Sequence, residues 1–353
     1  MKNFWFSIYH LYSASTRYSP RAVRAFARDV DDLLERDPDV GHVIMEDYYR
    51  ELAWGEYARP WNERTLREFV RMLHDRGLKF LPYVDATELA THAPSFEKNG
   101  RAWGAKTRWG KVYAGYSSVL YPSVYFLPRH EFFLRLACPA SGWADHLVEQ
   151  ARSVVEGFEA DGLYVDRLDY RVPCHDASHG GAGTGADPEH FSRGLVPLFE
   201  RLRAEAVESP GGRLLVMNDS CMDPDPIMGK LYRVADAVLS ELLLADMNPW
   251  GLENVLATRW GDLAWKFRRV LRPVLSVLLP ALYRRTPAMV DAARLLSIVA
   301  RIRRAAGDPK KSVLLFSHRV GEETRRLQRE MARRDRNLGV VHYFGPRPVA
   351  ENE

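Results

Sequence analysis

The feature that most constrains the fold is an alternation of short apolar segments with longer amphipathic ones. Eight segments have the length and the Val-, Leu-, Tyr- and Phe-rich composition of strands, and most are separated by stretches of helical periodicity. We expect the strands at 3–9, 41–49, 79–86, 161–169, 213–220, 236–244, 312–318 and 338–345. Strands that alternate with helices imply βαβ units, and eight such units favour an α/β fold closed into a (β/α)8 TIM barrel.

The amphipathic stretches carry helix signals at their ends. Ser19 and Pro20 form an N-cap followed by proline at the first helical position, and Asn62 is a cap of a helix that ends at Gly77. Ser141 is expected to cap a third helix that begins near Trp143. The sequence therefore predicts helices over 19–38, 62–77, 141–158, 188–209 and 322–335.

The chain is expected to form a single catalytic domain, 1–353. Residues 246–311 are long and mostly helical in pattern, and we expect them to be a helical insertion between strands six and seven. The apolar segment 270–279 offers an alternative, because it could itself supply the seventh strand. The Gly-rich segment 178–188 directly follows the fourth strand, which is where a barrel places substrate-facing loops.

The cysteines and the first residues bear on the compartment. Only three cysteines occur, Cys138, Cys174 and Cys221, and their spacing argues against a disulfide framework and against a structural zinc site. Residues 1–15 contain polar side chains inside the apolar run, so we interpret them as a first strand and not as a signal peptide. The segment 270–283 is too short to span a bilayer. We therefore expect a soluble, cytoplasmic protein with no membrane partner.

The charge is unevenly distributed along the chain. The net charge is +4, but residues 251–353 carry +11 and residues 1–250 carry −7. This asymmetry favours Arg-rich helix faces exposed to solvent, and the alternative is an anionic partner. No motif with interleaved aromatic residues supports a nucleic-acid partner, and the oligomeric state is left open.

Acidic residues stand where five of the eight predicted strands end. The strand ends read "MEDYY", "YVDA", "YVDRLDY", "VMNDS" and "LSELL". A carboxylate in a dry interior must be paired or face water, and a (β/α)8 barrel keeps its reacting groups at the C-terminal strand ends. The pattern therefore predicts a pocket lined by carboxylates.

Two of these acids are the candidate catalytic pair. Asp166 ends the fourth strand, and period-two alternation aims Tyr164 and Asp166 to the same side. Glu241 stands among leucines in the sixth strand, where desolvation would raise its pKa as a general acid requires. The alternatives are structural: an ion pair of Asp166 with Arg167 or Arg171, and neutralisation of Glu241 by a C-terminal arginine.

Other polar and aromatic residues near the strand ends are predicted to bind the substrate. Asn218 could donate to a sugar hydroxyl, and Asp219 could equally cap the following turn. The string "CHDASH" places His175, Asp176 and His179 close together, but it lies in a loop, so no metal and no cofactor are expected. The predicted substrate-binding residues are Tyr9, Asp47, Tyr48, Asp85, Tyr164, Asp169, Asn218 and Asp219.

One pattern in the sequence resembles glycoside hydrolase barrels. It consists of Trp143, the string "GFEADGLYVDRLDY" at 157–170, an Asn after the next strand and then an "SE" strand. It is similar to the endo-alpha-1,4-polygalactosaminidase-like group and to the alpha-galactosidase and alpha-amylase superfamily. In the first group an Asp that ends the fourth strand and a Glu that ends the sixth form the catalytic pair, which the resemblance implies for Asp166 and Glu241. The sequence departs from amylases at the fifth strand, which ends in "NDS" and has no clear Glu.

The leading hypothesis is a glycoside hydrolase that acts on an O-glycosidic bond of a carbohydrate. Asp166 would be the nucleophile or oxocarbenium stabiliser and Glu241 the general acid/base. Two alternatives are a barrel sugar isomerase or lyase, with or without metal assistance, and a non-catalytic carbohydrate-binding barrel. Aromatic platforms for the sugar would come from among Tyr9, Tyr48, Tyr49, Tyr83, Trp103 and Trp109.

Overall fold

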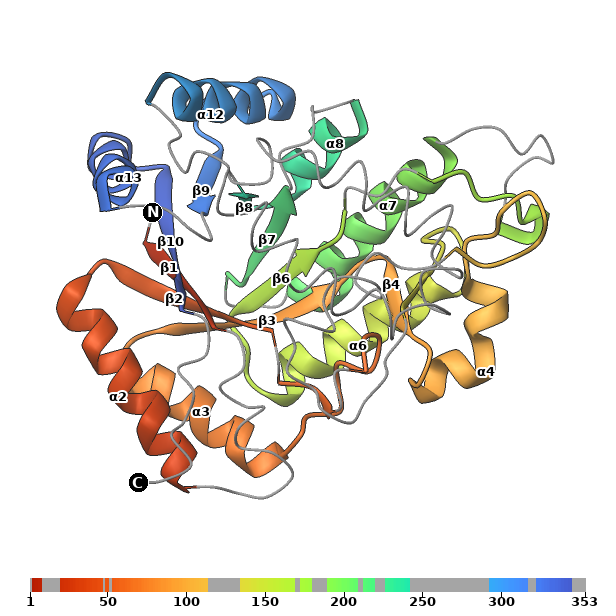
Figure 1. Ribbon diagram of the computed structural model, residues 1–353, viewed down its shortest axis with the longest axis horizontal. Coiled ribbons are helices and arrows are strands. Elements are labelled where there is room, and N and C mark those ends of the chain that lie inside the picture. Colours follow the sequence, from red (N-terminus) through yellow and green to blue (C-terminus); the bar gives the residue numbers. More distant parts are fainter. Residues whose placement is uncertain are drawn as a thin grey trace, which may run out of the picture.

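The protein folds into a closed barrel of eight parallel strands surrounded by helices (Figure 1). The structure, a computed structural model, describes residues 2–7, 20–46, 48–50, 53–113, 134–168, 172–179, 189–208, 212–219, 226–241, 292–316 and 322–344. Around the barrel each strand pairs with its neighbour in the chain, and β1 (Asn3–Ser7) closes the ring by pairing with both β2 (Val40–Met45) and β10 (Leu338–Phe344). The prediction of a (β/α)8 barrel is confirmed.

All eight predicted strands are present in the ring. The remaining barrel strands are β3 Lys79–Asp85, β6 Gly162–Asp166, β7 Leu214–Asp219, β8 Ala237–Glu241 and β9 Ser312–Phe316. The seventh strand of the barrel is therefore β9, and the alternative of 270–279 in that place is wrong. The strand predicted at 41–49 ends at Met45, because the chain bends at Glu46.

The helices pack around the outside of the barrel and return the chain from one strand to the next (Figure 1). They are α2 Pro20–Arg36, α3 Glu63–Asp75, α4 Pro94–Trp103, α6 Trp143–Gly157, α7 Glu189–Arg201, α8 Pro226–Val234, α12 Ala292–Ala306 and α13 Glu322–Arg334. Asn62 caps α3 as predicted, since its side chain accepts a hydrogen bond from the Thr65 amide over 3.0 Å. The cap predicted for α6 is off by one residue: Gly142 is the N-cap, and Ser141 accepts from the Trp143 amide over 3.2 Å.

Two local features interrupt the simple alternation of strands and helices. The connection from β3 to β6 contains, besides α4 and α6, a small antiparallel pair of strands, β4 (Glu88–Ala90) and β5 (Leu134–Leu136). The helix α7 continues directly into a π-helical turn, η4 (Leu202–Val207). The π-helical turn widens the last part of the helix that precedes β7.

The core is formed by the barrel interior and by the layer between barrel and helices. Fully buried aromatic side chains are numerous, and Trp143 of α6 is one of them. Its indole nitrogen donates to the Ala86 carbonyl over 2.7 Å, which ties the helix to the end of β3. Gly162 begins β6, where a Cβ atom would lie 2.2 Å from the Leu214 carbonyl oxygen. Glycine is therefore required at this contact between β6 and β7.

Polar side chains close the ring at its amino-terminal end. Asn3 Nδ2 and His342 Nε2 approach Asp37 Oδ2 at 2.8 and 2.6 Å, and the Val340 amide donates to Asn3 Oδ1 over 2.9 Å. Asp37 and Asn3 are buried, and His342 is largely so. These contacts join the first and the last strand of the barrel to the turn that precedes β2.

The predicted helical insertion falls mostly outside the described residues. Of the segment 246–311, residues 292–311 are described, and they form α12 and the turn that leads into β9. The insertion and the single-domain organisation of 1–353 therefore remain predictions. None of the helices within the described ranges is both long and apolar enough to cross a membrane.

Candidate active site

Four neighbouring barrel strands end in an acidic residue. The last residues of β3, β6, β7 and β8 are Asp85, Asp166, Asp219 and Glu241. Since all eight strands run parallel in a closed ring, these residues stand on the same rim, at the carboxyl ends of the strands. Glu46 follows directly after β2 on the same rim and is also buried. The backbone therefore places the acids where the sequence predicts a carboxylate-lined mouth.

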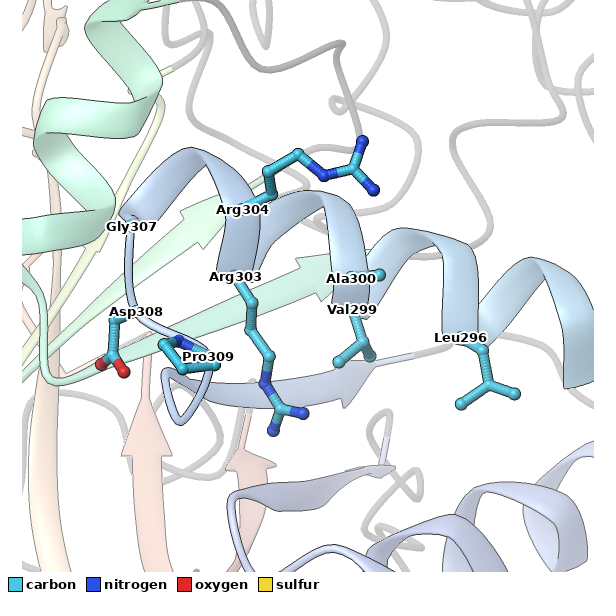
Figure 2. Close-up of a pocket in the computed structure, with 8 residues that line it drawn as sticks. All are labelled: Leu296, Val299, Ala300, Arg303, Arg304, Gly307, Asp308 and Pro309. Carbon is cyan, nitrogen blue, oxygen red and sulfur yellow. The ribbon is translucent and has the colours of Figure 1, made fainter.

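A hollow in the described part of the chain lies away from this rim. It has a volume of about 570 Å³ and lies along α12, between Leu296 and the turn at Pro309 (Figure 2). That turn leads into the amino end of β9, whereas the acids stand at the carboxyl ends of the strands. The lining consists of apolar residues, the two arginines Arg303 and Arg304 and a single acid, Asp308, so this hollow does not offer the pair of carboxylates that glycoside cleavage uses.

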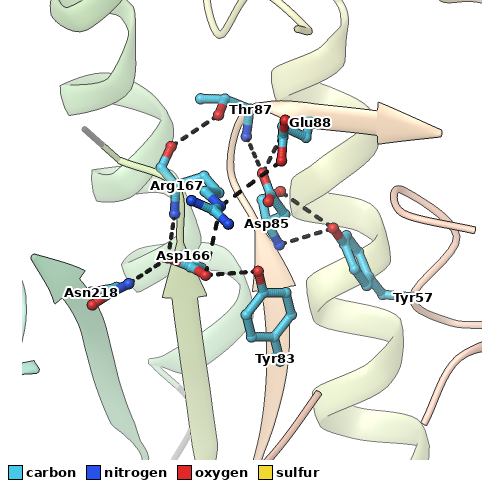
Figure 3. Close-up of polar contacts among 8 residues, drawn as sticks. All are labelled: Tyr57, Tyr83, Asp85, Thr87, Glu88, Asp166, Arg167 and Asn218. Atoms are coloured by element: carbon cyan, nitrogen blue, oxygen red, sulfur yellow. Dashed lines mark hydrogen bonds and ion pairs between the residues drawn. The ribbon is translucent and has the colours of Figure 1, made fainter. Parts of the chain in front are cut away.

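Asp166 holds its carboxylate between three hydrogen-bond donors (Figure 3). The Tyr83 hydroxyl donates to Oδ2 over 2.8 Å, and Asn218 Nδ2 donates to Oδ1 over 2.6 Å. The backbone amide of Arg167 also donates to Oδ1, over 2.7 Å. The donors come from β3, from β7 and from the residue after β6, so neighbouring strands fix the orientation of the carboxylate. Asp166 is 8% exposed, so its carboxylate is largely removed from solvent.

Arg167 adopts a backbone conformation that is uncommon outside glycine. Its φ is +56°, in the left-handed region, and the surrounding contacts must compensate the cost. Thr87 Oγ1 donates to the Arg167 carbonyl over 2.9 Å. The guanidinium lies between two acids, with Nε 3.9 Å from Glu88 Oε2 and 4.0 Å from Asp166 Oδ2. Left-handed residues held in this way are frequent in active sites.

Asp85 is the neighbour of Asp166 in the sheet, in direct register across β3 and β6. It is fully buried, and its Oδ1 accepts the backbone amides of Thr87 and Glu88 over 2.8 and 2.7 Å. Among the described residues its Oδ2 has no hydrogen-bond partner. Burial, helped by the nearby charges of Glu88 and Asp166, raises the pKa of Asp85 well above its usual value. A carboxyl group whose ionisation is disfavoured thus stands beside Asp166, whose carboxylate is held by donors.

The aromatic residues below Asp166 form the floor of the mouth. Tyr83 and Tyr164 stand in register on neighbouring strands, with ring centroids 5.6 Å apart, and both are buried. Tyr164 lies two residues before Asp166, and such positions share a face of the strand. Tyr48 is fully buried as well, and its hydroxyl donates to the Tyr83 carbonyl over 3.1 Å. In this structure Tyr48 therefore supports the position of Tyr83 through its backbone.

The structure describes some of the predicted site residues, whereas others lie outside the described ranges. It brings Asp85, Tyr164, Asn218 and Asp219 to the rim with Asp166, all of them buried. Glu241 is the last residue of β8, and its side chain lies outside the described part. The predicted substrate-binding residues that fall outside the described ranges are Tyr9, Asp47 and Asp169. For all of these residues the substrate contact remains a prediction.

Three residues around Asp166 escaped the sequence reasoning. They are Tyr57, whose hydroxyl accepts from the Asp85 amide over 2.9 Å, Thr87 and Glu88. Arg167 was expected only as an alternative ion-pair partner of Asp166, and its Nε lies 4.0 Å from Asp166 Oδ2. A signal for Glu88 was present, because "VDATEL" places a second acid three residues after Asp85. No sequence signal marks Arg167 as left-handed.

The acids of the mouth are not arranged as a metal site among the described residues. A group of three ligand atoms suited to a metal occurs elsewhere and consists of Cys138, Cys174 and His179. Of the "CHDASH" string, His179 belongs to this group, whereas Asp176 pairs with Lys106.

A family model with the description "Domain of unknown function (DUF6259)" matches residues 42–221. The matched span runs from β2 to just beyond β7. It includes Asp85, Asp166 and Asn218 and ends before Glu241. No curated protein matches the chain.

Solved structures with the same barrel include three enzymes that act on sugars. A cycloisomaltooligosaccharide glucanotransferase from Paenibacillus sp., complexed with cycloisomaltoheptaose, is 12% identical with a TM-score of 0.55, over 90% of this chain and 38% of the other. An alpha-galactosidase from Thermus thermophilus in complex with stachyose is 15% identical with a TM-score of 0.51, over 97% and 61%. The trehalose-6-phosphate hydrolase of Bacillus licheniformis is 11% identical with a TM-score of 0.51, over 89% and 56%.

These likenesses concern the fold. At such identities a similar structure establishes the barrel, and function must be argued from the site. The chain spans less than two thirds of the length of each of the three solved chains. The barrel is thus of the type found in glycoside hydrolases, as the resemblance in the sequence predicts.

Proposed function

The chain belongs to the family described as a domain of unknown function (DUF6259), and from that premise and the barrel mouth we propose that it is a glycoside hydrolase. It would cleave an O-glycosidic bond with two carboxylates, Asp166 as nucleophile or stabiliser and Glu241 as general acid/base. The observation that carries the proposal is the environment of Asp166: a carboxylate at the carboxyl end of the fourth barrel strand, oriented by Tyr83, Asn218 and the Arg167 amide.

The orientation of Asp166 suits attack on an anomeric carbon. Oδ1 accepts two of the three hydrogen bonds and Oδ2 accepts one, so Oδ2 keeps the more available lone pair. Because the donors come from the rigid strands β3 and β7, the carboxylate needs little reorganisation during the reaction. The raised pKa of Asp85 next to it disfavours a second negative charge beside Asp166.

The register of the sheet supports Glu241 as the partner. Asn218 pairs with Leu239 across β7 and β8, and positions 239 and 241 share one face of β8. Position 241 therefore stands on the face of the sheet that corresponds to Asn218, one level further toward the mouth. One strand, β7, separates Asp166 on β6 from Glu241 on β8 around the ring, and the two strand spacings that this makes leave room for a sugar ring.

In the retaining form of the reaction, Asp166 attacks the anomeric carbon while Glu241 gives its proton to the departing glycosidic oxygen. The bond from the anomeric carbon to that oxygen breaks as the bond to Asp166 forms. Glu241, now ionised, takes a proton from water, and the hydroxide attacks the anomeric carbon and releases Asp166. In the inverting form, one carboxylate activates the water directly, and no covalent intermediate forms.

The solved barrels indicate which substrates to test first. Two of them are named for alpha-galactosidase and glucanotransferase activities, and the complexes contain stachyose and cycloisomaltoheptaose. Aryl alpha-galactosides and alpha-glucosides are therefore the first panel, followed by the corresponding beta-glycosides. Release of the aryl group measures turnover, and proton NMR of the first sugar formed distinguishes retention from inversion.

The deciding comparison is Asp166→Asn against Asp145→Asn. Asp145 is an exposed residue of α6 that pairs with Arg201, so its amide variant controls for the loss of one carboxylate. We expect Asp166→Asn to lower kcat by several orders of magnitude and Asp145→Asn to stay near the wild type. An Asp166→Asn enzyme that turns over at the wild-type rate contradicts the proposal, and sugar binding with no turnover in the wild type would indicate a carbohydrate-binding barrel instead.

A further inference from the structure

Two cysteines and a histidine from separate connections meet close to the mouth of the barrel. Cys138 follows β5, in the connection between β3 and β6, whereas Cys174 and His179 lie in the segment after β6. Their ligand atoms lie within 4.8 Å of one another, and Cys174 Sγ is 3.3 Å from His179 Nδ1. Residues that are far apart in the sequence therefore converge on one point.

The three side chains are removed from solvent. Cys138 is 0%, Cys174 5% and His179 4% exposed. A buried histidine needs partners for both ring nitrogens, because an unsatisfied polar atom is costly inside a protein. His179 Nε2 contacts the Ala102 carbonyl oxygen at 2.6 Å, so Nε2 carries the proton and Nδ1 points to the sulfurs.

This arrangement of the histidine is the one that metal sites use. A histidine that ligates a metal through one nitrogen usually donates its other N–H to a carbonyl or carboxylate, which fixes the ring and its tautomer. The same turn of chain supports one of the cysteines, since the Cys138 amide donates to the Trp103 carbonyl over 2.7 Å. Ala102 and Trp103 end α4, so a single helix end orients both His179 and Cys138.

A metal ion at this point would be held by two sulfurs and one imidazole nitrogen. The thiolate is the form of cysteine that binds metals. Asp176 is engaged by Lys106 and Ser178, and its Oδ2 lies 3.6 Å from His179 Nε2, the ring nitrogen that does not face the sulfurs.

We propose that Cys138 Sγ, Cys174 Sγ and His179 Nδ1 form a zinc site. Two thiolates and an imidazole are a soft donor set that selects Zn²⁺ over Mg²⁺ or Ca²⁺. Zinc prefers four tetrahedral ligands, so a water molecule or an added ligand takes the fourth position. The ion ties the segment after β6, which begins beside Asp166, to the connection between β3 and β6. Its function is to hold these two walls of the mouth together.

The site differs from the one that the sequence suggests. The "CHDASH" string groups His175, Asp176 and His179 because they are close in the sequence, and only His179 belongs to the site. Cys138 is contributed from another connection, so no short ligand spacing reveals it. The wide spacing of the cysteines in the sequence, taken alone, argues against zinc. The fold brings Cys138 and Cys174 together, so the spacing no longer counts against a zinc site.

Cobalt(II) is the spectroscopic probe for the experiment. The full chain, purified with reductant and stripped with a chelator, is titrated with Co²⁺, and the thiolate-to-cobalt charge-transfer band is followed. We expect saturation at one equivalent and loss of the band when Zn²⁺ is added. Cys138→Ser, Cys174→Ser and His179→Ala should each weaken binding by more than about 100-fold, the upper end of what removal of an outer hydrogen-bond partner costs. His175→Ala, in the same loop, is the matched control and should bind as the wild type does.

A second measurement on the wild type does not depend on the folding of the variants. Equimolar Zn²⁺ should protect Cys138 and Cys174 from alkylation, as located by peptide mapping, and should raise the melting temperature. A wild-type protein without a charge-transfer band, or with unprotected cysteines in the presence of Zn²⁺, overturns the proposal. So does a band that persists in both cysteine variants. Recovery of a Cys138–Cys174 disulfide from protein kept under reductant would show a redox pair in place of a metal site.

Discussion

Asn218 donates its side-chain amide to Asp166 Oδ1 over 2.6 Å, across the neighbouring strands β7 and β6. Both residues are buried, so this bond forms where water competes little. It makes Asn218 a positioning residue for the proposed nucleophile.

Asn218→Ala should therefore lower kcat with little change in KM. A hydrogen bond to a charged group contributes about 1.5–3 kcal/mol, which corresponds to a loss of roughly 10- to 150-fold in rate. Steady-state kinetics with an aryl glycoside that the wild type cleaves measures this. A rise in KM at constant kcat would mean that Asn218 binds the substrate and does not position Asp166.

The raised pKa of Asp85 predicts how stability depends on pH. Its folded pKa lies above the unfolded value of about 3.9, so its contribution to stability is present below that value and is lost as the pH rises through the folded pKa. The wild type should lose up to about 1.4 kcal/mol per pH unit in that window from this group. Asp85→Asn does not titrate, so its unfolding free energy relative to the wild type should improve as the pH rises above the unfolded value. Urea unfolding at several pH values tests this, and parallel profiles of the two proteins would contradict a raised pKa of Asp85.

The left-handed backbone of Arg167 can be separated from its charge by two substitutions. Arg167→Ala and Arg167→Gly both remove the guanidinium that lies between Glu88 and Asp166, and Arg167→Ala should destabilise by about 3 kcal/mol. Glycine adopts φ = +56° without strain, so Arg167→Gly should be the more stable variant by about 1 kcal/mol. Denaturant unfolding gives both values. Alanine at least as stable as glycine would show that position 167 is not strained.

The contacts of Asp37 predict that the junction of β1, β10 and the turn before β2 loses stability in acid. Burial alone would raise the pKa of Asp37, but hydrogen bonds from His342 and Asn3 hold it below its usual value. Its contribution to stability is therefore present above about pH 3.9 and is lost as the pH falls through the folded pKa. Asp37→Ala should cost about 1–3 kcal/mol at neutral pH and flatten the acid limb of the stability profile.

Asp39→Ala is the matched control for this prediction. Asp39 lies in the same turn with an exposed side chain, and it contacts Asn3 and Asp37 through its backbone carbonyl and amide. The control should therefore change stability by less than about 0.5 kcal/mol. Equal losses for the two variants would show that the turn as a whole, and not the Asp37 carboxylate, carries the effect.

The sequence was sufficient for the barrel because strand and helix patterns are local. The residues around Val165 and the leucines of β9 each predict a strand without reference to the rest of the chain. Eight such strands, alternating with helices, commonly close into one type of barrel. The acids at the strand ends were predictable for the same reason, since the end of a strand fixes the rim on which Asp85 and Asp166 stand.

The rest of the site depends on contacts that no local pattern encodes. Asn218 reaches Asp166 because β7 pairs with β6, and Arg167 turns left-handed because Thr87 and Glu88 surround it. The meeting of Cys138 with Cys174 likewise requires two connections to pack together. Such contacts join residues that are far apart in the chain, so they follow from the fold and not from spacing.

The pairing of β1 with β10 has a consequence for synthesis on the ribosome. Residues Leu338–Phe344 leave the ribosome long after Asn3–Ser7, so the ring cannot close while the intervening chain is being made. Until then the growing sheet has two open edges, and open edges are templates for pairing with other chains. Nascent chains that stop short of Leu338 should therefore depend on chaperones. This dependence should end when β10 has been made and pairs with β1.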